Sequence, residues 1–183
     1  MQIVLGYTPL QVALAFLPAN IIMAAFSLGL SAKIVMRFGI RRPLAIGLGF
    51  GVLGLLLFAR APIDGTALID VLPGMVLLGL GAGVSFNPLL LAAMSDVQPS
   101  ESGLASGVVN TAFMMGGALG LAVLASLAAA RTEGLVAAGA NQAVALNEGY
   151  QAAFLAGAIF ATIAAVIGGT LIRTKLGAPA QWV

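Results

Sequence analysis

Long apolar runs alternate with short polar segments along the whole chain. Five stretches of at least 17 residues contain no Asp, Glu, Lys or Arg, and they cover residues 1–32, 43–59, 71–95, 102–130 and 149–172. A helix that crosses a bilayer core needs about 20 residues, and the stretches lack the two-residue alternation of barrel strands. The pattern predicts an all-α membrane protein, a single transmembrane bundle over residues 1–183 with helices near residues 9–32, 43–59, 67–95, 101–130 and 150–172.

Composition strengthens this prediction. Apolar residues make up 61% of the chain and charged residues 8%, and the mean hydropathy is +1.10, whereas about a quarter of residues in a soluble domain are charged. Cysteine and histidine are absent, which excludes disulfides, thiolate metal sites and imidazole chemistry. We therefore expect no cofactor, no metal and no enzymatic activity, and the net charge of +2 does not imply nucleic-acid binding.

The basic residues suggest an orientation in the membrane. Residues 33–42 hold four of the eight basic residues, namely Lys33, Arg37, Arg41 and Arg42. Short loops rich in Lys and Arg stay in the cytoplasm. The pattern predicts a multi-pass plasma-membrane protein with residues 33–42 as a cytoplasmic loop, the amino terminus outside and the carboxy terminus in the cytoplasm.

Three amide side chains fall inside apolar spans, where they are expected to face protein or water rather than lipid. They are Asn20, Asn87 and Asn110, and Phe86, Phe113 and Met114 lie near two of them in the sequence. Aromatic and thioether groups suit an adaptable apolar pocket, so these six residues are candidates for a substrate cavity. The alternative is that the amides form interhelical hydrogen bonds that only fix packing, each worth about 0.6–2 kcal/mol.

Glycines recur four residues apart in three of the spans. This spacing lets helix backbones approach closely, and it predicts helix packing at Gly47, Gly51, Gly79, Gly83, Gly116 and Gly120.

No ionisable side chain falls in the middle of a predicted span. Asp96 and Glu101 bracket the polar elbow between the third and fourth spans, where turn and helix-cap roles are expected. A proton-coupled transporter needs an acid within the membrane. Proton coupling would therefore require residues outside this chain.

Several segments resemble one known family. The segments are residues 37–42 (RFGIRR), 103–111 (GLASGVVNT) and 116–120 (GGALG). They are similar to the carboxy-terminal half of major facilitator superfamily transporters, in particular the fourteen-helix drug:proton antiporter branch. Residues 37–42, with Arg37, Gly39, Arg41 and Arg42, resemble the cytoplasmic signature loop of that family, but Met36 stands where an acid is usual.

The resemblance implies that the five helices match the last five of the second six-helix bundle. The first, third and fourth would line the cavity, and the second and fifth would face outward. The implied function is proton-coupled efflux of small hydrophobic or cationic solutes by alternating access, with the lipid bilayer and a missing amino-terminal transporter half as partners. Two alternatives stay open: a truncated or accessory membrane module that does not transport, and an uptake transporter for sugars or metabolites of the same family.

Overall fold

The computed structural model describes residues 8–63 and 65–171, and every regular element in these ranges is helical. The expected positions of the two chain ends fall on residues 1–7 and 172–183, outside the described residues. Helix α2 (Pro9–Ala25) begins with a capping box. The Oγ1 of Thr8 accepts a hydrogen bond from the Gln11 amide at 3.4 Å, and the Gln11 Oε1 accepts one from the Thr8 amide at 2.9 Å. Pro9 follows at the first helical position, where its missing N–H costs nothing.

The first predicted helix is broken before it reaches residue 32. The chain continues from α2 through a π-helical turn, η1 (Phe26–Leu30), and bends at Gly29, whose φ of 116° is a conformation that L side chains rarely adopt. Helix α3 (Ser31–Phe38) follows the bend and ends at Gly39, where φ is 75°. Residues 33–42 were expected to form a loop, but most of them are helical. The charges mark where the apolar span ends, and they do not end the helix.

The remaining helices are α4 (Arg41–Phe58), η2 (Ala67–Val71), α5 (Leu72–Met94), η3 (Pro99–Glu101), α6 (Ser102–Ala137) and α7 (Gln142–Leu171). The helix predicted to end at residue 130 continues to Ala137, and the next begins at Gln142 instead of residue 150. The alanine-rich sequence favours helix there, and Arg131 pairs with Glu148 at 2.7 Å across the two helices. The positions of the charged residues therefore predicted the end of α6 too early and the start of α7 too late.

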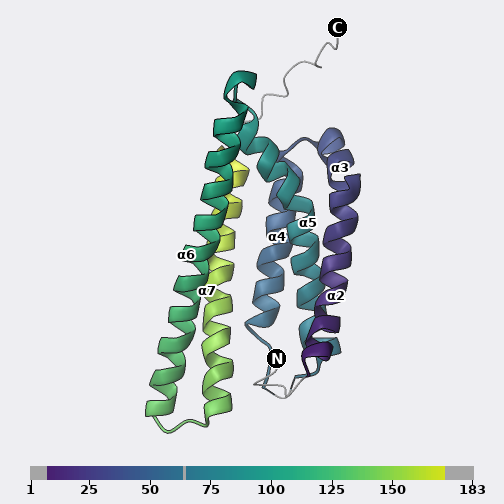
Figure 1. Cartoon of the computed structure of the whole chain (residues 1–183). Helices are drawn as coiled ribbons and strands as arrows, with labels where there is room; N and C mark the ends of the chain where they lie inside the picture. The colour runs from purple at the N-terminus through teal and green to yellow at the C-terminus, as the bar shows by residue number, and fades with distance from the viewer. Residues whose placement is uncertain (1–7, 64, 172–183) are drawn as a thin grey trace.

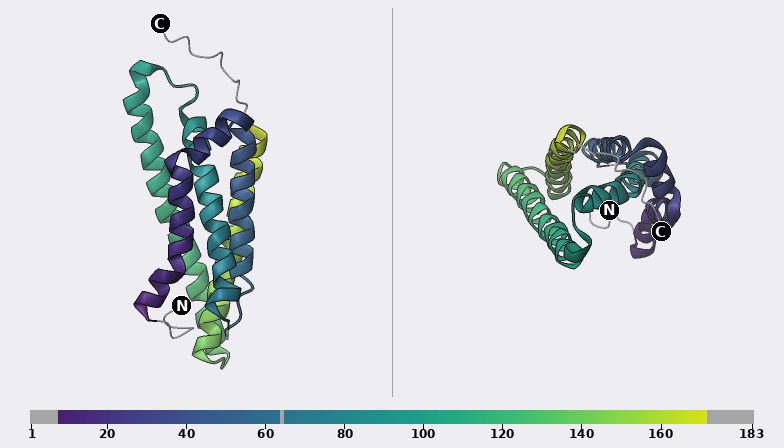
Figure 2. Two further views of the ribbon diagram at one scale, coloured as in Figure 1. Left: turned by 90° about the vertical axis from the view of Figure 1, so that its right-hand side faces the viewer. Right: turned by 90° about the horizontal axis from the view of Figure 1, so that it is seen from above.

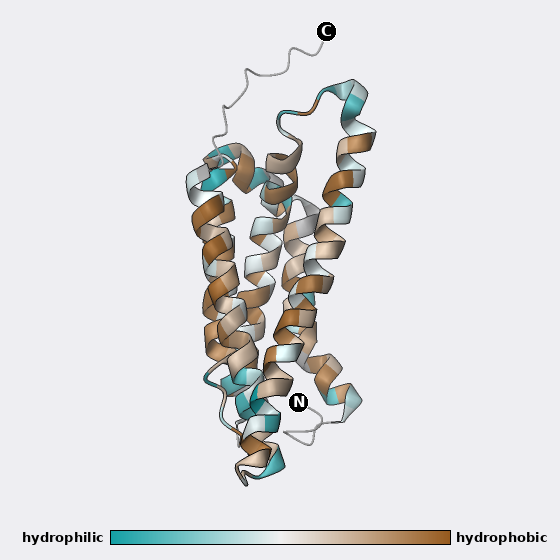
Figure 3. Ribbon diagram, turned by 90° about the vertical axis from the view of Figure 1, so that its left-hand side faces the viewer, coloured by the Kyte–Doolittle hydropathy of each residue, from teal (hydrophilic) through white to brown (hydrophobic). Residues whose placement is uncertain are grey.

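Four of the described helices are long and apolar enough to cross a membrane: Arg41–Phe58, Ile69–Met94, Pro99–Ala137 and Gln142–Thr170. The Pro9–Ala25 helix is apolar but shorter, which differs from the five full spans expected. Figure 3 shows apolar residues along the middle of the helices and polar residues gathered at both ends of the bundle. The architecture is that of an all-α membrane protein.

The helices pack in the order α2, α5, α4, α7, α6 (Figure 1). Helix α5 lies between α2 and α4, and α7 lies between α4 and α6. Seen from above, α6 stands apart from the α2–α5 side of the bundle (Figure 2). It packs mainly along α7, and none of its residues is buried. One side of α6 is therefore open in the described chain.

Candidate functional site

Glycines bring α4 and α5 into direct backbone contact. A Cβ atom added to Gly81 would lie 2.8 Å from both the carbonyl oxygen of Gly47 and the backbone nitrogen of Gly51. A Cβ atom added to Gly47 would lie 2.8 Å from the Cβ of Ser85. Only glycine fits at such distances, which is how small residues let membrane helices associate closely. These contacts fix α5 against α4.

The opposite side of α5 packs against α2, and glycines again allow the close contact. A Cβ atom added to Gly79 would lie 2.8 Å from the carbonyl oxygen of Ala19, and one added to Gly83 would lie 2.9 Å from the Cβ of Phe26. Helix α5 is thus held on both flanks and forms the centre of the packed region. The predicted pair Gly116 and Gly120 on α6 differs, because nothing lies within 4 Å of a Cβ added at either position.

The structure brings two of the six candidate cavity residues into contact. Phe86 of α5 and Phe113 of α6 meet edge to face, with ring centroids 5.8 Å apart and planes at 79°. Asn20 and Asn110 are exposed and Asn87 is half-buried. The side chains of these three amides make no hydrogen bond with another described residue. Met114 is 66% exposed on α6, one turn after Asn110 on the same helix face.

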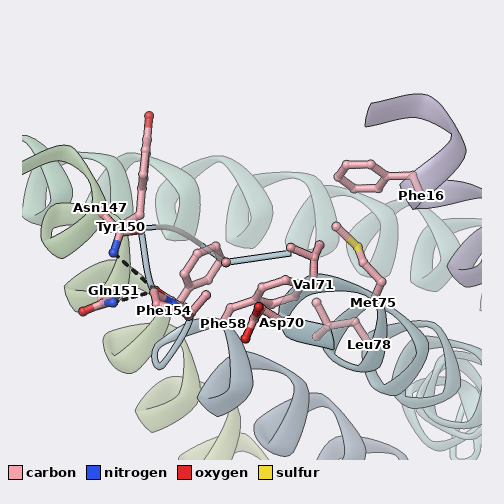
Figure 4. A pocket seen from close by; sticks show the side chains of 13 residues that line it. Phe16, Phe58, Asp70, Val71, Met75, Leu78, Asn147, Tyr150, Gln151 and Phe154 are labelled. Carbon is pink, nitrogen blue, oxygen red and sulfur yellow. Dashed lines mark hydrogen bonds between the residues drawn. The ribbon is translucent and has the colours of Figure 1, made fainter. Parts of the chain in front are cut away.

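A cavity of about 370 Å³ lies elsewhere, where α2, α4, α5 and α7 approach one another. Its apolar wall includes Phe16, Phe58, Met75 and Phe154, and Phe58 and Phe154 stack with ring centroids 5.2 Å apart (Figure 4). None of the six predicted cavity residues lines it. The sequence did not predict this cavity, because the cavity depends on how α7 packs against α4, which no single segment specifies.

Polar groups gather at one edge of this cavity. Asn147 Nδ2 and Gln151 Nε2 both donate to the carbonyl oxygen of Ala61, at 3.2 and 2.8 Å (Figure 4). Asp70 Oδ2 accepts a hydrogen bond from the amide of Thr66 at 2.7 Å and so caps the turn before α5. The amides tie α7 to the end of α4. The two amides are four residues apart, which puts both on one helical face, and this spacing in the sequence is consistent with a shared acceptor.

The charged side chains lie at the two ends of the bundle. Lys33, Arg37, Arg41 and Arg42 are exposed on α3 and at the start of α4. The acids Asp96 and Glu101 lie at the α5–α6 connection, which is at the same end as α3 (Figure 1). The described residues include no group of His, Cys, Asp and Glu side chains that could hold a metal ion. The cavity itself is lined by apolar and aromatic groups and by the polar side chains of Asp70, Asn147 and Gln151.

These features define a multi-pass membrane protein whose helices pack through glycines and carry amides within apolar spans. Residues 1–121 match the family model described as Major Facilitator Superfamily. The chain belongs to this superfamily.

Its relatives include named exporters and resistance proteins. The chain is 34% identical to the "Cephamycin export protein CmcT" of Amycolatopsis lactamdurans over 73% of this chain and 28% of the relative. It is 33% identical to the "Puromycin resistance protein pur8" of Streptomyces alboniger, over 75% of this chain and 28% of the relative. It is 36% identical to the "Multidrug resistance protein Stp" of Mycobacterium tuberculosis, over 71% of this chain and 24% of the relative. The matches span about a quarter of the length of these relatives.

Proposed function

We propose that this chain forms part of a secondary transporter that exports small hydrophobic or cationic solutes. The names of the relatives, which refer to export of and resistance to antibiotics or drugs, support export as the direction of transport. In such a transporter two helical bundles rock around a solute site near the middle of the bilayer. This chain would supply one wall of the site, and an amino-terminal bundle would supply the other.

The observation that carries the proposal is the placement of three amides in apolar helices. Asn20 lies on α2, Asn87 on α5 and Asn110 on α6, and none is buried. A polar side chain in hydrocarbon is costly unless it faces protein or water. The amides are therefore explained if this side of the bundle borders a solute pathway, with Phe86 and Phe113 as its aromatic lining.

The open side of α6 supports the need for further protein. Its 36 residues include none that is buried. A Cβ atom added at any of five of its glycines would meet nothing within 4 Å, namely at Gly103, Gly107, Gly116, Gly117 and Gly120. By contrast, a Cβ atom added at Gly47 of α4 or at Gly79 or Gly83 of α5 would lie within 2.9 Å of a neighbouring helix, although one added at Gly51 would also meet nothing within 4 Å. An apolar helix from an amino-terminal bundle would pack against the glycines on the open side of α6.

Proton coupling would depend on that second bundle. The acids of the described chain, at positions 70, 96, 101, 133 and 148, lie at helix ends and connections. None is placed to carry a proton across the middle of the membrane. We therefore assign the coupling acid to residues outside this chain.

The basic residues indicate how the bundle is oriented in the membrane. Four of the six basic residues in the described ranges lie at the α3 end of the bundle. By the positive-inside rule this end faces the cytoplasm, which puts the α6–α7 turn and the start of α2 outside.

Efflux of a fluorescent lipophilic cation tests the proposal. The chain is expressed alone and together with the amino-terminal half of a close relative, and dye loss is followed after energisation. Transport is expected only from the pair. It should fall in Asn110→Leu, which removes an amide from the open side of α6, and persist in Gln98→Ala, which removes an amide at the elbow. Equal transport by Asn110→Leu would contradict the assigned wall, and failure of every pairing to transport would favour an accessory role.

A further inference from the structure

Helix α3 has one face on the bundle and one face turned away from it. Ser31 is 1% exposed, and Ile34 and Val35 are half-buried. On the opposite side of the helix, Lys33 and Arg37 are exposed and Met36 is 79% exposed. Residues three and four apart lie on the same helical face. The outward face of α3 is therefore formed by two cations with an apolar side chain between them.

The bend at Gly29 determines where this face lies. After the bend, α3 crosses from the end of α2 to the start of α4 at one end of the bundle (Figure 2). It contacts α4 and α5 there. This end is where the apolar spans stop and charged residues begin. In a bilayer that covers the apolar spans, the outward face of α3 would lie at the level of the lipid headgroups.

Within the described ranges no acidic side chain pairs with the cations of this region, and Arg37 lies over the ring of Phe38, 5.5 Å from its centroid. The ion pair among the described residues joins Arg131 of α6 to Glu148 of α7 at 2.7 Å, at the other end of the bundle. Arg41 and Arg42 follow α3 directly and are exposed as well. Four exposed cations thus occupy ten consecutive residues, from 33 to 42. The acids at this end, Asp96 and Glu101, form no salt bridge with them.

We propose that the outward face of α3, together with the start of α4, is a binding site for the phosphate of anionic phospholipid headgroups. We call this surface, made of Lys33, Met36, Arg37, Arg41 and Arg42, the α3 basic face. Arginine donates paired hydrogen bonds to phosphate oxygens. An apolar side chain among cations is typical of helices that lie in the membrane interface. Met36 enters the acyl boundary while the cations hold the phosphate.

The α3 basic face explains features that topology alone does not. An orientation signal requires only basic residues near the end of a span. It does not require a separate helix across the bundle end, or an exposed Met36 between Lys33 and Arg37 in the sequence. A lipid site requires both, because the phosphate and the acyl chains of one lipid must be met together. The inference does not depend on the solute that the protein carries.

Lipid binding to the purified full chain tests this inference. The chain in neutral detergent is titrated with phosphatidylglycerol, and bound lipid is counted by native mass spectrometry. Each cation near an anionic surface contributes about 1 kcal/mol, so Arg37→Gln should weaken binding about fivefold and Lys33→Gln/Arg37→Gln about 25-fold. Arg60→Gln, which removes an exposed cation at the other end, is the matched control and should bind as the wild type does.

Additional titrations distinguish binding of the lipid from binding of phosphate alone. Phosphatidylcholine should bind much more weakly than phosphatidylglycerol, and Met36→Ser should weaken the binding of phosphatidylglycerol. Millimolar inorganic phosphate should not displace the lipid. Equal binding of both lipids, displacement by inorganic phosphate, or equal losses in Arg37→Gln and Arg60→Gln would overturn the inference. Circular dichroism and melting temperatures of all variants check that the helices are retained.

Discussion

Phe86 of α5 and Phe113 of α6 meet edge to face, with their ring centroids 5.8 Å apart. This contact joins α6, which packs mainly along α7, to the central helix α5. Both rings keep substantial exposure, at 39% for Phe86 and 61% for Phe113. The pair is therefore a small aromatic bridge between the packed part of the bundle and its open helix. It also supplies the two aromatic groups of the proposed solute wall.

Removal of either ring should loosen α6. Edge-to-face pairs contribute about 0.5–1.5 kcal/mol beyond the area they bury. A double-mutant cycle with Phe86→Ala and Phe113→Ala, measured by unfolding in detergent, should give a coupling energy in this range. Phe160→Ala, which removes an exposed ring of α7, is the control and should show no coupling to Phe86→Ala. A coupling energy of zero for the pair would mean that the bridge does not hold α6.

Glycine substitutions should separate the packed helices from the open one. Gly81→Ala places a Cβ atom 2.8 Å from backbone atoms of Gly47 and Gly51, and overpacking of this kind costs about 1–3 kcal/mol. Gly116→Ala meets nothing within 4 Å and adds a better helix former. Melting temperatures in detergent should fall for the first variant and stay level or rise for the second. A similar fall in both would contradict the packing difference between α5 and α6.

The two amides on Ala61 should act redundantly. Asn147→Ala or Gln151→Ala leaves the carbonyl oxygen with one side-chain donor, so each should cost about 0.5–1.5 kcal/mol. The double variant leaves the partly buried carbonyl without either side-chain donor and should cost more than the sum, because an unsatisfied acceptor shielded from water is expensive. Unfolding free energies, together with amide hydrogen exchange at residues 59–63, measure the effect. Gln142→Ala, at the exposed start of α7, should change neither, and strict additivity would argue against the shared acceptor.

Gly29 should be required for the bend between α2 and α3. Its φ of 116° is a strained conformation for an L residue, costing about 1–3 kcal/mol. Gly29→Ala should therefore lower the melting temperature and change the distance between spin labels at Met36→Cys and Leu53→Cys, which the cysteine-free chain permits. Gly169→Ala has open space around it and is the control. An unchanged distance in Gly29→Ala would show that other residues set the bend.

The sequence was sufficient for the properties that depend on local composition. Apolar runs of helical length identify a membrane protein, and the segments at residues 37–42, 103–111 and 116–120 point to the superfamily that the comparison then established. Helix ends were less accurate, since charges mark the edge of an apolar span and a helix can continue past them. Arg131 and Glu148 illustrate this, because they lie within helices and pair across them.

Other properties depend on which segments meet. Gly47 and Gly116 occur in similar sequence patterns, yet a neighbouring helix packs closely at the first and open space surrounds the second. The cavity beside Phe58 is lined by residues from distant segments, and at its edge Asn147 and Gln151 reach the carbonyl oxygen of Ala61, which is 86 and 90 residues away in the sequence. Hydropathy and spacing are properties of one segment, so the sequence by itself determined the membrane helices and the family. A packed glycine, a cavity and an open face are relations between distant segments, and only the tertiary structure decided them.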